Sequence, residues 1–210
     1  LASAWMLAVR EAGCAATPDR RAAQGELLLD RWAEPHRRYH DLRHLTAVLH
    51  GLDRLTHPES PPATVRLAAW FHDAVYRGRP GIDEEASAVL AEQVLAGLLA
   101  PARVPPEVAR LVRVTGDHVV ADGDVDGGLL VDADLAILAA PPERYLEYAR
   151  AVRAEYAHLP DSAFVAGRLA ALTSLAGRGT LFATARGAEL WDRAARANLN
   201  AEIDRLSGGG

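Results

Sequence analysis

The sequence predicts an all-α protein that folds as one compact domain of about nine or ten helices over residues 1–207. Apolar residues recur at every third or fourth position along most of the 210 residues, which is the spacing of one helix face. Glycine and proline cluster between these stretches, and no alternation of apolar and polar residues is long enough for a sheet. Short connections without a low-complexity linker favour one domain over two. The glycines at 208–210 are expected to form a flexible tail.

Several helices carry a recognisable start signal. Pro18-Asp19 opens the second helix, and Pro61-Pro62 precedes the fourth. Three acidic residues at 83–85 suit the positive dipole end of the fifth, and Pro105-Pro106 begins the sixth. Residues 121–128, rich in aspartate and glycine, are expected to be a loop. The expected helices are 3–14, 18–33, 41–55, 63–76, 83–99, 105–118, 132–138, 142–157, 161–175 and 188–206.

The composition excludes several classes of function. All 23 basic residues are arginine, so neither a Schiff-base lysine nor a Walker-type phosphate loop is possible. The net charge of −5 argues against duplex nucleic acid as a partner. The longest stretch without a charged side chain, residues 93–102, is too short to span a membrane. The single cysteine, Cys14, cannot form an internal disulfide, so a cytoplasmic location is expected.

Histidine and aspartate stand out against an apolar background. Five of the eight histidines lie at positions 36, 40, 44, 50 and 57. His72 and Asp73 are adjacent within the otherwise apolar stretch 70–76, and Asp132 and Asp134 lie within the apolar stretch 130–138. A carboxylate is costly to bury unless it is paired or coordinates a cation, and no arginine is close in sequence to Asp132 or Asp134. A bound metal ion would account for both anomalies.

This ordered pattern of a histidine, a His-Asp pair and a distant aspartate resembles the HD-domain metal-dependent phosphohydrolases. The flanking residues are similar to those of a bacterial subfamily of predicted HD phosphohydrolases, and the similarity extends from about residue 38 to residue 206. The segments that carry it are 38–40, His44, 70–76, 84–87, 132–135, 153–156, 167–168 and 195–199. The resemblance implies an HD-type helical domain and a metal-dependent phosphohydrolase.

The resemblance also implies a metal site. Its ligands would be His44, His72, Asp73 and Asp134. Two imidazoles and two carboxylates without a thiolate suit Mn²⁺, Fe²⁺, Co²⁺, Ni²⁺ or Mg²⁺ better than a structural zinc ion. A water activated by such an ion would attack phosphorus, with Asp73 in the catalytic centre. Asp132 is the alternative to Asp134 as the ligand, and otherwise orients a ligand from behind.

The remaining roles are assigned to nearby residues. Glu84 is chosen over Glu85 as the general acid or base, since residues 74–77 lack the acidic residue that many HD hydrolases carry there. Arg38, His118 and Arg153 are the candidate contacts to the phosphate of a small substrate such as a nucleotide. His40 is expected to support the site or cap a helix, and is the alternative ligand to His44.

Two other functions remain open at this point. HD-type di-iron oxygenases need additional histidines between the His-Asp pair and the final aspartate, and this chain offers only His118 there. A non-catalytic helical module that binds a nucleotide or a protein and keeps a structural metal ion is the other alternative. The sequence leaves the oligomeric state open, a homodimer included.

Overall fold

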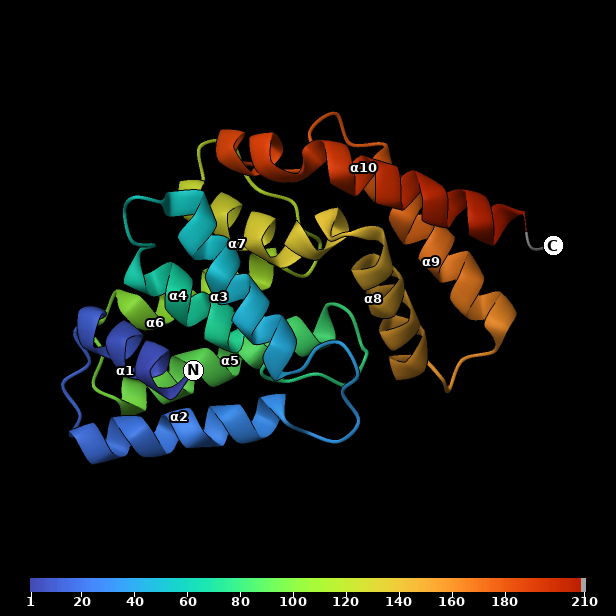
Figure 1. The fold of residues 1–210 in the computed structure, drawn as a ribbon. Helices are drawn as coiled ribbons and strands as arrows, with labels where there is room; N and C mark the ends of the chain where they lie inside the picture. The colour runs from blue at the N-terminus through green and yellow to red at the C-terminus, as the bar shows by residue number, and fades with distance from the viewer. Residues whose placement is uncertain (209–210) are drawn as a thin grey trace.

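The computed structural model describes residues 1–208, which contain ten α-helices, one 3₁₀ helix and no β-strand (Figure 1), so the all-α prediction is confirmed. Gly208 follows the last helix, and residues 209–210 of the predicted tail lie outside the described residues. The helices are α1 (Ala2–Glu11), α2 (Pro18–Trp32), α3 (Leu42–Thr56), α4 (Ala63–Phe71), α5 (Ile82–Gly97), α6 (Val104–Val114), α7 (Val125–Leu135), η1 (Ala136–Ala139), α8 (Pro142–Glu155), α9 (Asp161–Ala176) and α10 (Ala185–Ser207).

Helix α4 forms the centre of the core. It packs against α1, α3, α5, α6 and α7, and all five residues from Leu67 to Phe71 are fully buried. A short helix whose last five residues are all apolar is stable only when other helices surround that part of it. The chain that leaves α4 at His72 therefore emerges inside the protein rather than at its surface.

The C-terminal helices join this core through η1. Helix α10 packs along η1 and α9, and in Figure 1 α8, α9 and the end of α10 extend to one side of α1–α7. The Asn198 amide donates to the carbonyls of Leu138 and Ala140, at 2.8 Å each, and so satisfies the end of the 3₁₀ turn. These contacts fix the position of α10 against the core and support a single compact domain.

The predicted helix 63–76 ends earlier, at Phe71. Side chains from other elements bind the backbone that follows it. The buried Arg37 guanidinium donates to the carbonyls of Asp73 and Ala74, at 2.8 and 3.3 Å. The Ser87 hydroxyl accepts from Val75 N at 3.0 Å. These groups replace the helical hydrogen bonds, so His72 and Asp73 lie in a turn instead of on a continuous helix.

Two further predicted boundaries are wrong, around the loop 121–128. Helix α6 ends at Val114 instead of 118, and α7 begins at Val125 instead of 132. Asp124 caps α7 by accepting from Gly127 N at 3.1 Å. A Cβ atom on Gly128 would lie 3.3 Å from the Thr184 side chain, so glycine here serves close helix packing rather than a turn. Within residues 1–208, no helix has both the length and the apolar character that crossing a membrane requires.

Candidate metal centre

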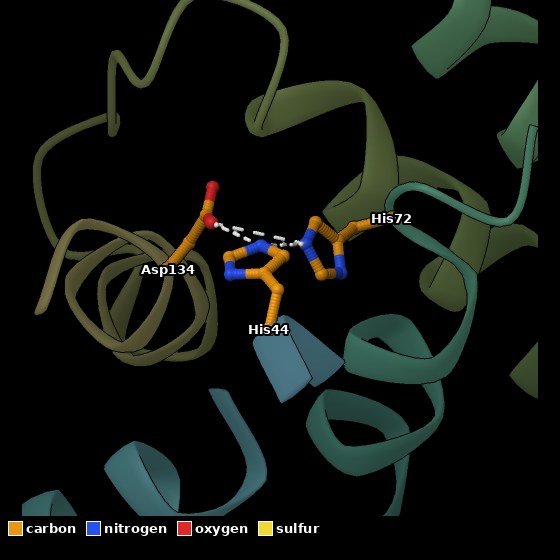
Figure 2. Close-up of side chains that lie close together, drawn as sticks. All are labelled: His44, His72 and Asp134. Atoms are coloured by element: carbon orange, nitrogen blue, oxygen red, sulfur yellow. Dashed lines mark hydrogen bonds and ion pairs between the residues drawn. The ribbon is translucent and has the colours of Figure 1, made fainter. Parts of the chain in front are cut away.

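His44 is placed by the start of α3. The Asp41 carboxylate accepts from Arg43 N at 2.8 Å and from His44 N at 3.3 Å, which fixes the first helical turn at this point. His44 is only 3% exposed, and its ring points inward toward the end of α4 (Figure 2). The N-cap thus determines which side of α3 carries the imidazole into the core.

His72 has a defined tautomer. Its Nδ1–H donates to the Ala69 carbonyl at 2.9 Å, and the residue is 1% exposed. When the ring is neutral, this hydrogen bond leaves the lone pair on Nε2. A histidine held in this way is ready to bind a metal ion through Nε2.

The carboxylate of Asp134 comes from the last turn of α7, which packs against α3. Its Oδ1 atom lies 3.1 Å from His44 Nε2 and 3.7 Å from His72 Nε2. A Cβ atom on Gly51 would lie 3.2 Å from Ala133, so only a residue without a side chain allows α3 and α7 to approach this closely. The three side chains therefore converge from α3, α7 and the turn that follows α4 (Figure 2).

Asp73 adds a second carboxylate to the same point. Its Oδ2 atom lies 3.2 Å from His72 Nε2 and 3.6 Å from His44 Nε2. Neither Asp73 nor Asp134 pairs with an arginine anywhere in residues 1–208, although each side chain is only 14% exposed. The four predicted ligands thus come together as two imidazoles and two carboxylates without an arginine to neutralise them.

The distances among His44, His72 and Asp134 are close to those of three ligands of one divalent ion. Bonds of about 2.0–2.2 Å place two ligands of one ion roughly 2.8–3.6 Å apart, for angles between a right angle and the tetrahedral angle. Five of the six distances among the four ligand atoms run from 3.1 to 3.7 Å. The sixth, between the carboxylates of Asp73 and Asp134, is longer, because Asp73 is not part of the group whose ligand atoms all lie within 4.8 Å of one another. His44, His72 and Asp134 form a group able to hold a metal ion, and Asp73 lies beside it.

The charges of these groups depend on one another. Burial lowers the pKa of His44. Burial also opposes the charged form of His72, but the Asp73 carboxylate outweighs it and raises the pKa of His72 to about 9. Although burial raises the pKa of the Asp73 carboxyl, the His72 imidazolium holds it well below its usual range. In the metal-free protein a proton on His72 supplies positive charge that a divalent ion would supply instead.

Asp132 has a different role from Asp134. It is fully buried, and its oxygens accept from Ala183 N at 2.6 Å, Thr184 N at 2.8 Å and the Thr184 hydroxyl at 2.6 Å. Thr184 in turn caps α10. Asp132 therefore fastens the segment before α10 to α7 and points away from the cluster, because residues two apart on a helix do not face the same side.

A cavity of about 360 Å³ opens onto Asp73 and Asp134. Four tyrosines and three arginines contribute to its wall: Tyr39, Tyr76, Tyr148, Tyr156, Arg79, Arg168 and Arg178. Glu84 and His118 also line it. Burial raises the pKa of Glu84, whose carboxylate accepts from Gly81 N at the start of α5. The candidate acid or base thus faces the cavity while it also caps its own helix.

The structure does not bring Arg38 or Arg153 to this cavity. Arg38 is exposed, and only its backbone makes hydrogen bonds: its N–H donates to Glu155 and its carbonyl accepts from Arg43. The Arg153 guanidinium donates to the carbonyls of Tyr156 and Leu159 and to Asp161, at 2.6–3.1 Å, and so closes the turn between α8 and α9. Neither of these two predicted substrate contacts lines the cavity, and the Arg153 guanidinium is bound to other groups.

His40 and Glu155 form a pair that the sequence does not reveal. Glu155 Oε2 accepts from His40 Nδ1 at 2.7 Å and from the Tyr76 hydroxyl at 2.9 Å. Its Oε1 atom accepts from three consecutive backbone N–H groups, at 2.8, 2.8 and 3.0 Å. The two residues are 115 positions apart, so only packing of α8 against the segment before α3 unites them. The sequence signals that point to His40 are the histidine-rich segment and the resemblance over residues 38–40, and neither indicates Glu155 as its partner.

Comparison of the chain with protein-family models, curated proteins and solved structures gives no match.

Proposed function

We propose that this chain is a metal-dependent phosphohydrolase of the HD type, which cleaves a phosphate ester of a small molecule such as a nucleotide. The observation that supports this most strongly is the convergence of His44, His72 and Asp134, with Asp73 beside them, where Asp73 and Asp134 line a cavity. The carboxylates of Asp73 and Asp134 have no arginine partner, which favours a bound cation, and a cavity of this size accommodates a small molecule. The cytoplasm remains the expected compartment.

The donor set limits the ion. The cluster offers nitrogen and carboxylate oxygen without sulfur, which suits Mn²⁺, Fe²⁺, Co²⁺, Ni²⁺ or Mg²⁺. When bound, such an ion would supply Lewis acidity toward a phosphoryl oxygen and an activated water. His72 remains oriented by its bond to Ala69, and Asp73 and Asp134 provide the negative charge that retains the ion.

His40 is our candidate for proton transfer. Its Nδ1–H is held by Glu155, and its ring stacks on Tyr76 with 4.1 Å between centroids. Its Nε2 atom makes no hydrogen bond within residues 1–208, and the residue lines the cavity beside Asp73. Burial lowers the pKa of His40, but the Asp73 and Glu155 carboxylates outweigh it and raise the pKa. His40 is therefore suited to donate a proton from Nε2 to a leaving oxygen. Glu84 is the second candidate on the same cavity.

Arg79 is the best placed arginine for the substrate. Arg168 is paired in a bidentate manner with Glu202, at 3.0 Å for both contacts, so its charge is neutralised. Arg79 lines the cavity and forms no ion pair within the described part of the chain. Its guanidinium is free to bind phosphate oxygens, the role that was expected of Arg38 and Arg153.

A phosphatase screen tests the proposal. The purified chain is assayed on phosphomonoesters, nucleotides and cyclic nucleotides with added Mn²⁺, Co²⁺ or Mg²⁺, beside Asp73→Asn. Asp126→Asn, in the first turn of α7 and away from the cluster, is the matched control. We expect hydrolysis by wild type and Asp126→Asn and its loss in Asp73→Asn. Metal binding without hydrolysis of any substrate would instead favour a binding module.

A further inference from the structure

His118 has an unusual backbone. Its φ angle is +54°, in the left-handed region that side chains with a Cβ atom avoid. Such a conformation is strained and persists only when the surroundings of the residue hold it in place. His118 follows the end of α6, where His118 N still donates to Val114 O at 3.1 Å. The conformation turns the imidazole back toward α7.

Arg178 holds this conformation from the other side. Its Nη1 atom donates to the His118 carbonyl at 2.8 Å, and Nη2 donates to the Asp117 carbonyl at 2.9 Å. Arg178 lies 60 residues later in the chain, in the turn between α9 and α10. That turn is itself held by Arg196 of α10, which donates to the carbonyls of Ala176, Arg178 and Gly179 at 3.0–3.2 Å.

The imidazole of His118 reaches the metal centre through Asp134. His118 Nε2–H donates to Asp134 Oδ2 at 3.0 Å, while Oδ1 faces His44 Nε2 at 3.1 Å. The two oxygens thus have separate partners, and the bond to His118 fixes the rotation of the carboxylate. A hydrogen bond behind a ligand commonly sets how that ligand meets its ion.

We propose that His118, held by Arg178, is a positioning residue that orients Asp134 toward the metal ion. The turn between α9 and α10 is then part of the metal site, although it contributes no ligand. The inference rests on the metal site of the proposed function but not on phosphatase activity, so the two fail separately.

Calorimetric titration of the metal-stripped full chain with Mn²⁺ tests the inference. Arg178→Gln removes the guanidinium that binds the carbonyls of Asp117 and His118. His118→Asn tolerates the left-handed backbone but is too short to reach Asp134. His118→Gln keeps an N–H donor near the position of Nε2. Arg186→Gln, an exposed residue of α10 that pairs with Glu189, is the control.

We expect Arg178→Gln and His118→Asn to weaken Mn²⁺ binding by about 10- to 100-fold. His118→Gln and Arg186→Gln should remain within about threefold of wild type, with the stoichiometry unchanged, since the donor to Asp134 is kept. The visible spectrum of bound Co²⁺ should change in His118→Asn and be restored in His118→Gln.

Three results would overturn the inference. The first is unchanged Mn²⁺ affinity in both His118→Asn and Arg178→Gln. The second is loss of a second equivalent of metal from His118→Asn with the first retained, because His118 would then be a ligand of another ion. The third is a wild type that binds no divalent ion. Wild type that binds Mn²⁺ but hydrolyses nothing contradicts only the phosphohydrolase. If His118→Asn does not fold, as judged by circular dichroism, the Mn²⁺ affinities of Arg178→Gln and His118→Gln are compared instead. Equal affinities in these two variants would overturn the inference.

Discussion

The Nε2 atoms of His44 and His72 lie 3.1 Å apart in the core, 28 residues apart in sequence. Because His72 Nδ1–H is bound to a carbonyl, neutral His72 presents a lone pair to His44. Two ring nitrogens at this distance, flanked by two carboxylates, need a positive charge between them. Either a proton on one ring or a divalent ion supplies this charge. The proton and the ion therefore compete for the same place between the two rings.

The first prediction concerns metal content. Wild type should bind about one equivalent of divalent metal per chain, as measured by elemental analysis after dialysis. His44→Ala and Asp134→Asn should each lose it, because each removes one ligand of a small set. His50→Ala, exposed on the same helix as His44, is the matched control and should retain the metal. Equal retention in all variants would show that the ion binds elsewhere.

Asp132 and Asp134 should respond in opposite ways. Asp132→Asn places an amide among three donors that Asp132 now satisfies, so it should lower the free energy of unfolding by on the order of 2–3 kcal/mol. It should still bind about one equivalent of metal. Asp134→Asn should lose the metal with a smaller effect on the stability of the metal-free chain. Urea unfolding and metal analysis of both variants check this, and loss of metal from Asp132→Asn alone would reverse the assignment.

The His40–Glu155 pair should control turnover. His40→Asn should lower kcat by about 10²- to 10⁴-fold, the usual worth of a positioned proton donor, at unchanged metal content. Glu155→Gln should also lower kcat. It puts an amide NH₂ group in place of Oε2, and this group cannot accept the hydrogen bond from His40 Nδ1. Steady-state kinetics with metal analysis separate this from ligand loss. A normal kcat for His40→Asn would leave Glu84 as the candidate.

Glu155 should also give the stability a pH dependence. Although burial raises its pKa, hydrogen bonds from His40 and from backbone N–H groups lower the pKa from the ordinary 4.5 to about 2. A lowered folded-state pKa stabilises above pH 4.5, by about 3 kcal/mol, and this contribution disappears as the pH falls toward about 2. The difference in unfolding free energy between wild type and Glu155→Gln should therefore shrink below pH 4.5. A constant difference would mean that the carboxylate charge is unimportant.

The arginines should divide into two classes. Arg79→Gln should raise KM, because Arg79 lines the cavity without an ion pair. Arg153→Gln should lower the Tm with little change in KM, since its guanidinium closes the turn between α8 and α9. Kinetics and thermal unfolding of both variants check this. A raised KM in Arg153→Gln at an unchanged Tm would show that Arg153 contacts the substrate.

The helices are largely predictable from apolar spacing, because each buries at least one face, and α4 buries all of its second half. Their ends are less predictable where distant side chains bind the backbone. Arg37 binds the Asp73 carbonyl just after the end of α4. Gly128 packs closely against Thr184, and its segment is helical in α7 although its glycines favour a loop. Such contacts join residues far apart in the chain, so no local pattern contains them.

The metal ligands are also only partly predictable from the sequence. His72-Asp73 and Asp134 are visible because charge within an apolar run is anomalous wherever it occurs. Asp132 shares that anomaly, and only its three contacts to the segment before α10 distinguish it from Asp134. Arg153 is the predicted contact in its segment, yet the residue there that reaches His40 is Glu155, two positions later.

By itself, the sequence determines the all-α class, the order of the helices and the residues that are too polar for their surroundings, because these depend on composition and spacing along one chain. Only the tertiary structure decides which aspartate meets His44, that Glu155 holds His40, and that Arg178 holds the strained His118 behind Asp134. The physical reason is that a hydrogen bond acts over about 3 Å, and the residues it selects are brought within that distance by helices packed from distant parts of the chain.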